Sequence, residues 1–274
     1  MLSVNTNLGA MIALQYLNQT NTELQVTQGH INSGLKVAGP KDNGAVYAIA
    51  QNMRGNVAGY AAVTDSLNRG TSTVDVAIAA GQSISDLLTE LKAKALAAAD
   101  SSLDTASRNA MNADFTALRD QITTIVQNAS FNGVNLVDGT TANIQALASS
   151  DGTKKITVSG QTLKLSGSIV TVTSTATIST TAKASTMIAT INTSIQNVGA
   201  ALAKMASGAR KFAIQSSFVT KLVDTLNAGI GNLVDADMAV ESAKLQSLQV
   251  KQQLGVQALA IANASPSIVL SLFR

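Results

Sequence analysis

The chain has 274 residues, of which 46% are hydrophobic, 3% are aromatic and 13% are charged, and its formal net charge is +3. The absence of cysteine excludes disulfides and thiol chemistry, and the single histidine, His30, excludes the two-histidine H-E-x-x-H motif of zinc proteases. The lysines and arginines form no cluster, which argues against a nucleic-acid-binding protein, and no apolar run reaches the roughly 20 residues of a membrane span.

Residues 4–35 predict the first helix, whose one charged residue is Glu23. Its seven-residue spacing is that of a coiled coil, in which amides within the seam fix the register at a cost in stability. Two interpretations remain: an amphipathic helix resting on its own domain, or a helix enclosed by neighbouring subunits, which we favour because both chain ends are poor in charge. The two lines of the predicted seam are Ala10, Leu17, Leu24 and Ile31, and Leu14, Asn21, Gln28 and Leu35.

Two further helices follow in the N-terminal half. Residues 33–40 contain two glycines and a proline, which end the first helix, and Asp42 is placed to cap the next. Apolar residues then follow an approximate 3.5-residue period over 53–95. Asp104 is a predicted N-cap for a third helix, in which apolar residues over 111–129 alternate steps of four and three. We expect these two helices to be antiparallel neighbours because their connection is short.

The sequence changes character after residue 131. Residues 140–181 are rich in Thr, Ser and Gly, and turn dipeptides appear at Asn132-Gly133, Asp138-Gly139, Asp151-Gly152 and Ser159-Gly160. Apolar and polar residues alternate in this stretch, which is the period of strands. We therefore expect a small β insert, with a disordered Ser/Thr-rich segment as the alternative. The predicted strand pairs are Ile156 and Val158, Leu163 and Leu165, Val170 and Val172, and Ala176 and Ile178.

A long fourth helix is predicted over residues 188–226. Apolar residues recur there every three or four positions with one polar exception, Ser216. At 1.5 Å per residue this helix is roughly 58 Å long, so we expect an elongated molecule. Gly229 and Gly231 are predicted to end the helix.

The last predicted helix begins near Asp235 and Asp237 and ends at Ser265-Pro266. Two acids at this spacing can hold a metal, but acids at a helix N-terminus also complement the helix dipole, which is the interpretation we prefer. The tail over 268–273 is strongly apolar and needs a partner in the assembled protein. Elsewhere the sequence contains no catalytic constellation.

Six short stretches, in their order along the chain, resemble bacterial flagellin. The resemblance covers nearly the whole chain outside residues 140–181, and the six stretches together are highly specific. They are Val4-Asn5-Thr6-Asn7, Ile31-Asn32-Ser33-Gly34-Leu35-Lys36, Asp42-Asn43-Gly44-Ala45, Phe131-Asn132-Gly133, Asp235-Ala236-Asp237-Met238-Ala239 and Val269-Leu270-Ser271-Leu272.

The resemblance implies a secreted structural subunit that self-assembles into the bacterial flagellar filament for swimming motility, and not an enzyme. It implies no cofactor, metal, nucleic acid or membrane span. The implied partners are other copies of the chain, a flagellar export chaperone, the flagellar type III export apparatus, and the hook-associated junction and cap proteins. The alternatives are a hook–filament junction protein that shares these termini, and a surface adhesin or glycan-bearing module built on the insert.

The expected fold class is mainly α: an elongated antiparallel helical bundle or coiled coil formed by the N- and C-terminal regions, with a small inserted β region. By resemblance, residues 1–42 and 232–274 form a terminal coiled-coil core region, 43–139 and 182–231 a helical rod domain, and 140–181 a surface-exposed insert. The expected self-assembly interface consists of apolar residues near the two ends of the chain: Leu14, Leu17, Leu24, Ile31, Leu35, Leu245, Leu248, Leu254, Leu259, Ile261, Leu270 and Phe273.

Overall fold

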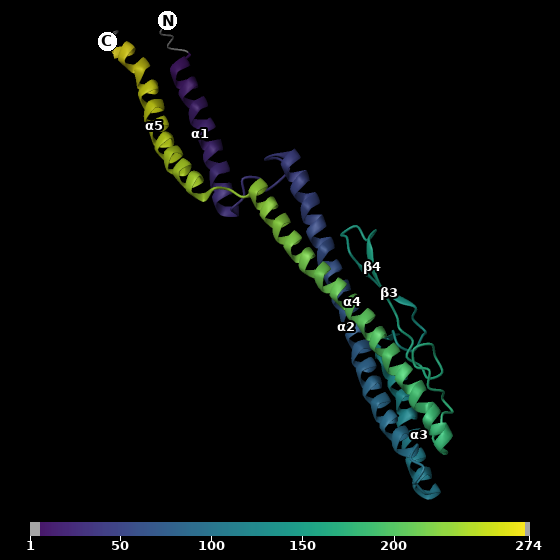
Figure 1. The fold of residues 1–274 in the computed structure, drawn as a ribbon. Helices are drawn as coiled ribbons and strands as arrows, with labels where there is room; N and C mark the ends of the chain where they lie inside the picture. The colour runs from purple at the N-terminus through teal and green to yellow at the C-terminus, as the bar shows by residue number, and fades with distance from the viewer. Residues whose placement is uncertain (1–5, 272–274) are drawn as a thin grey trace. The chain divides into compact units, whose positions relative to one another are not determined.

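The computed structural model describes residues 6–271, with side chains described as far as residue 264. Helices dominate this part of the chain (Figure 1), which confirms the predicted mainly α fold class. The helices are α1 (Leu8–Ser33), α2 (Gly44–Ala98), α3 (Thr105–Asn128), α4 (Thr181–Val234) and α5 (Met238–Ser271). The strands are β1 (Ser130–Phe131), β2 (Val134–Asn135), β3 (Asn143–Leu147) and β4 (Lys155–Ser159). The chain divides into two compact units: unit 1 is Met1–Gly55 with Thr225–Arg274, and unit 2 is Asn56–Asp224.

Unit 1 contains α1 and α5, which lie side by side and run in opposite directions (Figure 1). Asn7 caps α1, since its side-chain Oδ1 accepts a hydrogen bond from the Ala10 N–H at 3.0 Å. At the other end of α1, Gly34 takes the left-handed conformation with φ of 71°, which ends the helix as predicted. Asp237 caps α5 by accepting from the N–H groups of Ala239 and Val240.

The two segments that join α1 to α2 and α4 to α5 cross each other. Leu35 and Asp235 form an antiparallel β-bridge. The Lys36 N–H donates to the Val234 carbonyl at 2.8 Å, and the Ala236 N–H donates to the Gly34 carbonyl at 2.9 Å. Backbone hydrogen bonds therefore tie the two linkers together.

The prediction that Asp42 caps α2 is wrong. Its carboxylate turns back and accepts from the Ala38 and Gly39 N–H groups, each at 2.9 Å. Asn43 instead accepts from the Val46 N–H at 3.1 Å, because it is the residue directly before Gly44, where α2 begins.

Unit 2 is built around the apolar faces of α2, α3 and α4. The predicted period of α4 is confirmed, because the residues at seven-residue intervals along it are fully buried: Ile191, Val198, Met205, Phe212 and Val219. The core also contains large buried side chains from α2 and α3, including Leu67, Ile84, Leu88, Leu91, Phe115 and Ile122. Unit 2 thus closes a continuous apolar core within one chain.

The predicted cap of α3 is confirmed. The Asp104 carboxylate accepts from the N–H groups of Ala106 and Ser107 at 3.2 and 3.3 Å. Hydrogen bonding, with Ser107 the main donor, holds the pKa of this exposed carboxyl below its ordinary value. The negative charge also lies at the positive end of the helix dipole, so it favours the start of α3.

The β region consists of two antiparallel hairpins. Asn132 and Gly133, both with positive φ, form the tight turn between β1 and β2, and the Asp151-Gly152 corner lies between β3 and β4. Only Ile156 and Val158 of the predicted strand pairs lie in a strand. The other three pairs lie in loops of the described structure, because their apolar side chains pack into the core of unit 2 without a partner strand; the fully buried ones are Leu163, Val170, Val172 and Ile178.

The β3–β4 hairpin packs closely against α4. A Cβ atom at Gly208 of α4 would lie 2.5 Å from Cγ1 of Val158, a residue of β4, so only glycine permits this contact without a shift. The Gln215 side-chain amide also donates to the Ala148 carbonyl at 3.0 Å. The hairpin is therefore held on unit 2 by both packing and hydrogen bonding.

Two predicted helix ends are wrong. Helix α4 continues past Gly229 and Gly231 to Val234, and α5 continues past Pro266 to Ser271. A Cβ at Gly229 would lie 3.1 Å from the Cε of Met53, so this glycine allows close packing with α2. Glycine lowers the stability of a helix, but tertiary packing overrides that preference at Gly229.

Candidate functional site

The facing sides of α1 and α5 form a seam with the spacing of a coiled coil. On each helix a series of half-buried or buried residues advances by alternate steps of three and four. The α1 series is Ala10, Ala13, Leu17, Thr20, Leu24, Thr27 and Ile31, and the α5 series is Glu241, Leu245, Leu248, Gln252, Gly255, Leu259 and Ala262. Eight of these fourteen side chains are small or polar, so the seam is thin compared with an all-leucine coiled coil.

One of the two predicted lines of the α1 seam is displaced by one residue. The line of Ala10, Leu17, Leu24 and Ile31 is half-buried as predicted, but Leu14 and Gln28 are exposed. The second line instead consists of Ala13, Thr20 and Thr27. A 3.5-residue period permits a companion position three or four residues away, and the small side chains of Ala and Thr give too weak an apolar signal to decide between them.

The residues predicted as the self-assembly interface fall into two groups. Seven are half-buried or buried within unit 1: Leu17, Leu24, Ile31, Leu35, Leu245, Leu248 and Leu259. Three are exposed, namely Leu14, Leu254 and Ile261, with exposed fractions of 47%, 58% and 73%. Phe273 and the side chain of Leu270 lie outside the described residues. Seven of the twelve side chains are therefore at least partly covered within unit 1, and three remain accessible to a partner.

Polar contacts cross the seam at residues that the sequence did not pair. His30 Nδ1 lies 3.0 Å from Glu241 Oε1, and both side chains are largely buried. The Gln252 side-chain amide donates to the Asn21 Oδ1 at 2.7 Å. In both pairs the two residue numbers add to nearly the same value, as they must for antiparallel helices. Once the pairing of α1 with α5 is assumed, this relation is the signal that could have located Glu241 as the partner of His30.

The outer surface of the pair is apolar and poor in charge. Its exposed large apolar residues on α1 are Leu8, Met11, Ile12, Leu14, Tyr16 and Val26, and those on α5 are Met238, Val240, Val250, Leu254, Val256 and Ile261. We call these twelve residues the exposed apolar surface of unit 1. Soluble monomers rarely expose so many large apolar side chains on two adjacent helices, so this surface indicates a protein–protein contact.

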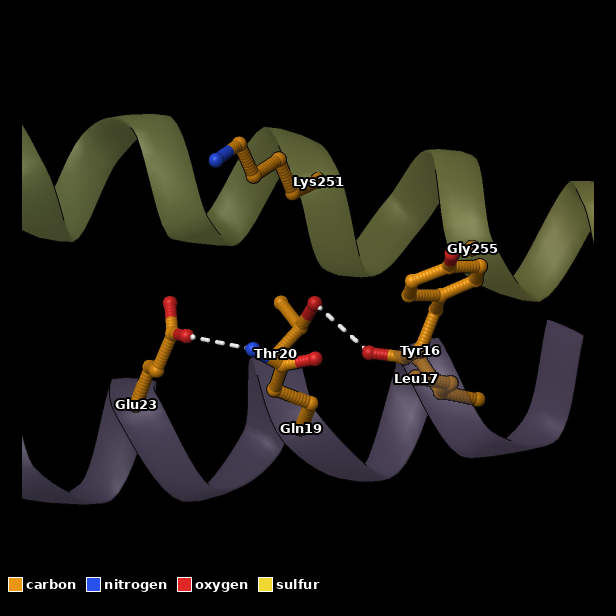
Figure 2. Close-up of a pocket in the computed structure, with 7 residues that line it drawn as sticks. All are labelled: Tyr16, Leu17, Gln19, Thr20, Glu23, Lys251 and Gly255. Carbon is orange, nitrogen blue, oxygen red and sulfur yellow. Dashed lines mark hydrogen bonds between the residues drawn. The ribbon is translucent and has the colours of Figure 1, made fainter. Parts of the chain in front are cut away.

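A hollow of about 360 Å³ lies between α1 and α5 (Figure 2). Thr20 and Gly255 both line it, and Gly255 lies against Leu17, where a Cβ atom would come within 3.2 Å of the Leu17 Cδ1. Glu23 of α1 and Lys251 of α5 lie on its rim, while Tyr16 and Leu17 supply apolar surface (Figure 2). The Gln19 amide donates to Glu23 at 3.2 Å. The hollow offers shape and apolar surface to another side chain, but no nucleophile–base pair for catalysis.

The described residues contain no group of three or more His, Cys, Asp or Glu side chains that could hold a metal ion. Within the same part of the chain, no helix combines the length and hydropathy needed to cross a bilayer.

Comparison with known proteins gives matches at both ends of the chain. Residues 4–142 match the bacterial flagellin N-terminal helical region, and residues 188–273 match the bacterial flagellin C-terminal helical region. Flagellin FljK of Caulobacter vibrioides is 55% identical, covering 99% of this chain and 98% of that protein. A flagellin of Brucella melitensis is 36% identical over the full length of both chains. The crystal structure of Bacillus cereus flagellin aligns with a TM-score of 0.43 and 19% identity, covering 66% and 94% of the two chains.

Proposed function

The chain belongs to the bacterial flagellin family, and we propose that its copies join through the exposed apolar surface of unit 1. The protein is a structural subunit of the extracellular flagellar filament, which serves motility, and it is not an enzyme. As a flagellin, it self-assembles into polymers. The alternatives of a hook–filament junction protein and of an adhesin are not favoured by these matches.

The observation that carries the proposal is the contrast between the two faces of α1 and α5. Facing side chains such as Leu248, with 2% exposure, are used within the chain, while Leu254, six residues further along α5, is 58% exposed. Water has few charged groups to solvate on these helices: within α1, only Glu23 and His30 are ionisable groups apart from Tyr16. Burying this surface against further copies removes apolar area from water, at about 25 cal/mol per Å².

A subunit that joins its neighbours through different parts of its surface generates an open helical array when the rotation between neighbours does not close into a ring. In such a filament we propose that residues 1–42 and 232–274 form the core region, 43–139 and 182–231 the surrounding rod, and 140–181 the part that faces outward. The thin seam of α1 and α5 favours this assignment, because its small side chains allow helices of several copies to pack closely.

An apolar surface of this kind needs protection before assembly. We therefore include among the partners a flagellar export chaperone for the apolar C-terminal region, and the flagellar type III export apparatus. The same surface is suited to the hook-associated junction and cap proteins that flank a filament. These partners are supported by the chemistry of the surface and by family membership.

The proposal is tested by adding one charge to the exposed surface. We expect Leu254→Asp to raise the critical concentration for extension of filament seeds at least tenfold, because it removes an apolar contact and buries a carboxylate. Leu96→Asp is the matched control, since Leu96 is 63% exposed on α2 in unit 2. Seeded growth is followed by light scattering and electron microscopy, and circular dichroism checks that both monomers keep their helix content. Equal growth of Leu254→Asp and the wild-type chain would contradict the proposal.

A further inference from the structure

Pro266 lies inside α5, which extends from Met238 to Ser271. In a continuous α-helix the N–H of each residue donates to the carbonyl four residues earlier. Proline has no backbone N–H, so it cannot make this bond. The carbonyl that loses its usual donor is that of Ala262, a half-buried residue at the end of the seam with α1.

A side chain from α1 donates to this same carbonyl. The Asn7 Nδ2 lies 2.7 Å from the Ala262 carbonyl oxygen, a contact between residues 255 positions apart in the chain. The Oδ1 of the same amide accepts from the Ala10 N–H at 3.0 Å and caps α1. Both ends of the Asn7 amide are therefore occupied, one within α1 and one on α5.

We propose that Asn7 and Pro266 form a matched pair that sets the register of α1 against α5. Pro266 removes the N–H that would otherwise occupy the Ala262 carbonyl, and Asn7 supplies the missing donor from the opposite helix. A shift of α1 by one helical turn, about 5.4 Å, takes Asn7 away from the carbonyl that Pro266 leaves without its helical donor. A polar contact at a single seam position is a known way to specify register. Asn7 is in this sense a positioning residue for assembly, which rests on the proposed function of the terminal helices.

The contact between Asn21 and Gln252 provides an internal comparison. It also crosses the seam at 2.7 Å, but it joins two side-chain amides and leaves the helical hydrogen bonds of both backbones intact. It therefore stabilises the pair without depending on a proline. Removing it weakens the seam to the same extent whether or not residue 266 carries an N–H.

The pairing is tested with a double-mutant cycle on the full chain. Asn7→Ser keeps a side chain that can cap α1 but is too short to reach the Ala262 carbonyl. Pro266→Ala restores the N–H that occupies this carbonyl. We expect Asn7→Ser to raise the critical concentration for seeded growth about fivefold in the wild-type background, and less than twofold in the Pro266→Ala background.

Asn21→Ala is measured in the same two backgrounds as the matched control, and its effect is expected to be equal in both. If Asn7→Ser stops growth completely, rescue by Pro266→Ala supports the pairing and failure to rescue contradicts it. The inference is overturned if Asn7→Ser has the same effect in both backgrounds. It is also overturned if the effect of Asn21→Ala depends on Pro266→Ala as strongly as that of Asn7→Ser does. A wild-type chain that does not extend seeds overturns the proposed assembly instead, so the two failures are distinguishable.

Discussion

The seam of unit 1 and the core of unit 2 are built on the same helical period, but they bury their apolar side chains to very different extents. The core of unit 2 is lined by large side chains that are fully buried, such as Phe115, Phe212 and Met205. The seam of unit 1 has threonine, glutamine and glycine at positions where a stable coiled coil has leucine. Unit 2 thus satisfies its own apolar surface, whereas unit 1 leaves much of its apolar surface outside the seam.

This difference separates two kinds of stability. An isolated chain gains most of its folding free energy from the apolar core of unit 2, because burial is nearly complete there. The α1–α5 pair gains less from its seam, and in the proposed assembly it gains more from surfaces that other copies cover. On that proposal, we expect the stability of the terminal helices to depend on subunit concentration.

The largest expected effect comes from truncating a core phenylalanine. Phe212→Ala removes a fully buried ring from α4 and is expected to lower the free energy of unfolding of the monomer by about 3–5 kcal/mol. Phe218→Ala on the same helix is the control, since its ring is 54% exposed, and we expect a change within about 0.5 kcal/mol. Urea unfolding followed by circular dichroism measures both. Similar losses for the two variants would contradict the view that the core of unit 2 supplies most of the monomer's free energy of folding.

A smaller effect is expected at the contact between α4 and the β3–β4 hairpin. Gly208→Ala forces a Cβ against Val158, so we expect the monomer to lose about 1–3 kcal/mol through overpacking. Gly199→Ala lies on the same helix with open space around it, and we expect a gain of up to about 1 kcal/mol from helix propensity. A lower thermal midpoint for Gly208→Ala and a higher one for Gly199→Ala support the described packing of the hairpin on α4. A higher thermal midpoint for Gly208→Ala would exclude this packing.

The smallest effect sharpens the description of the seam. Thr27 is fully buried, and its Oγ1 has no hydrogen-bond partner among the described residues. We therefore expect Thr27→Val to stabilise the filament by about 1 kcal/mol, seen as a higher temperature of depolymerisation. Thr22→Val is the control, because Thr22 is exposed and its hydroxyl donates to the Asn18 carbonyl. A loss of stability on removing the Thr27 hydroxyl would indicate that it has a partner in the filament.

The sequence predicts the helices well because their information is local. The seven-residue spacing over α4 locates its buried face, and the cap at Asp104 follows from residue type and position. The same local rules fail at Gly229 and Pro266, where α4 and α5 continue. At both places a distant residue lies in contact with the helix: Met53 against Gly229, and Asn7 on the Ala262 carbonyl, one turn before Pro266.

The candidate site was predictable in outline only. Apolar residues such as Leu254 and Leu248 look alike in the sequence, yet one is exposed and the other is buried. Their separation requires the register of α5 on α1, which depends on contacts such as His30 with Glu241, more than 200 residues apart. Periodicity locates the helices that carry the site, but the register that divides inner from outer residues is a tertiary property.

The hydrogen-bonded pairing of the two linkers, 34–43 and 235–237, has a mechanical consequence. Because Lys36 bonds to Val234 and Ala236 bonds to Gly34, a pull on either terminal helix is shared by two strands of backbone acting in parallel. Two tethers in parallel resist twisting more than one flexible tether, and neither can lengthen without breaking the bonds to the other. We therefore expect the paired linkers next to α1 and α5 to resist twisting more than one unpaired linker would, which suits a subunit of a rotating filament.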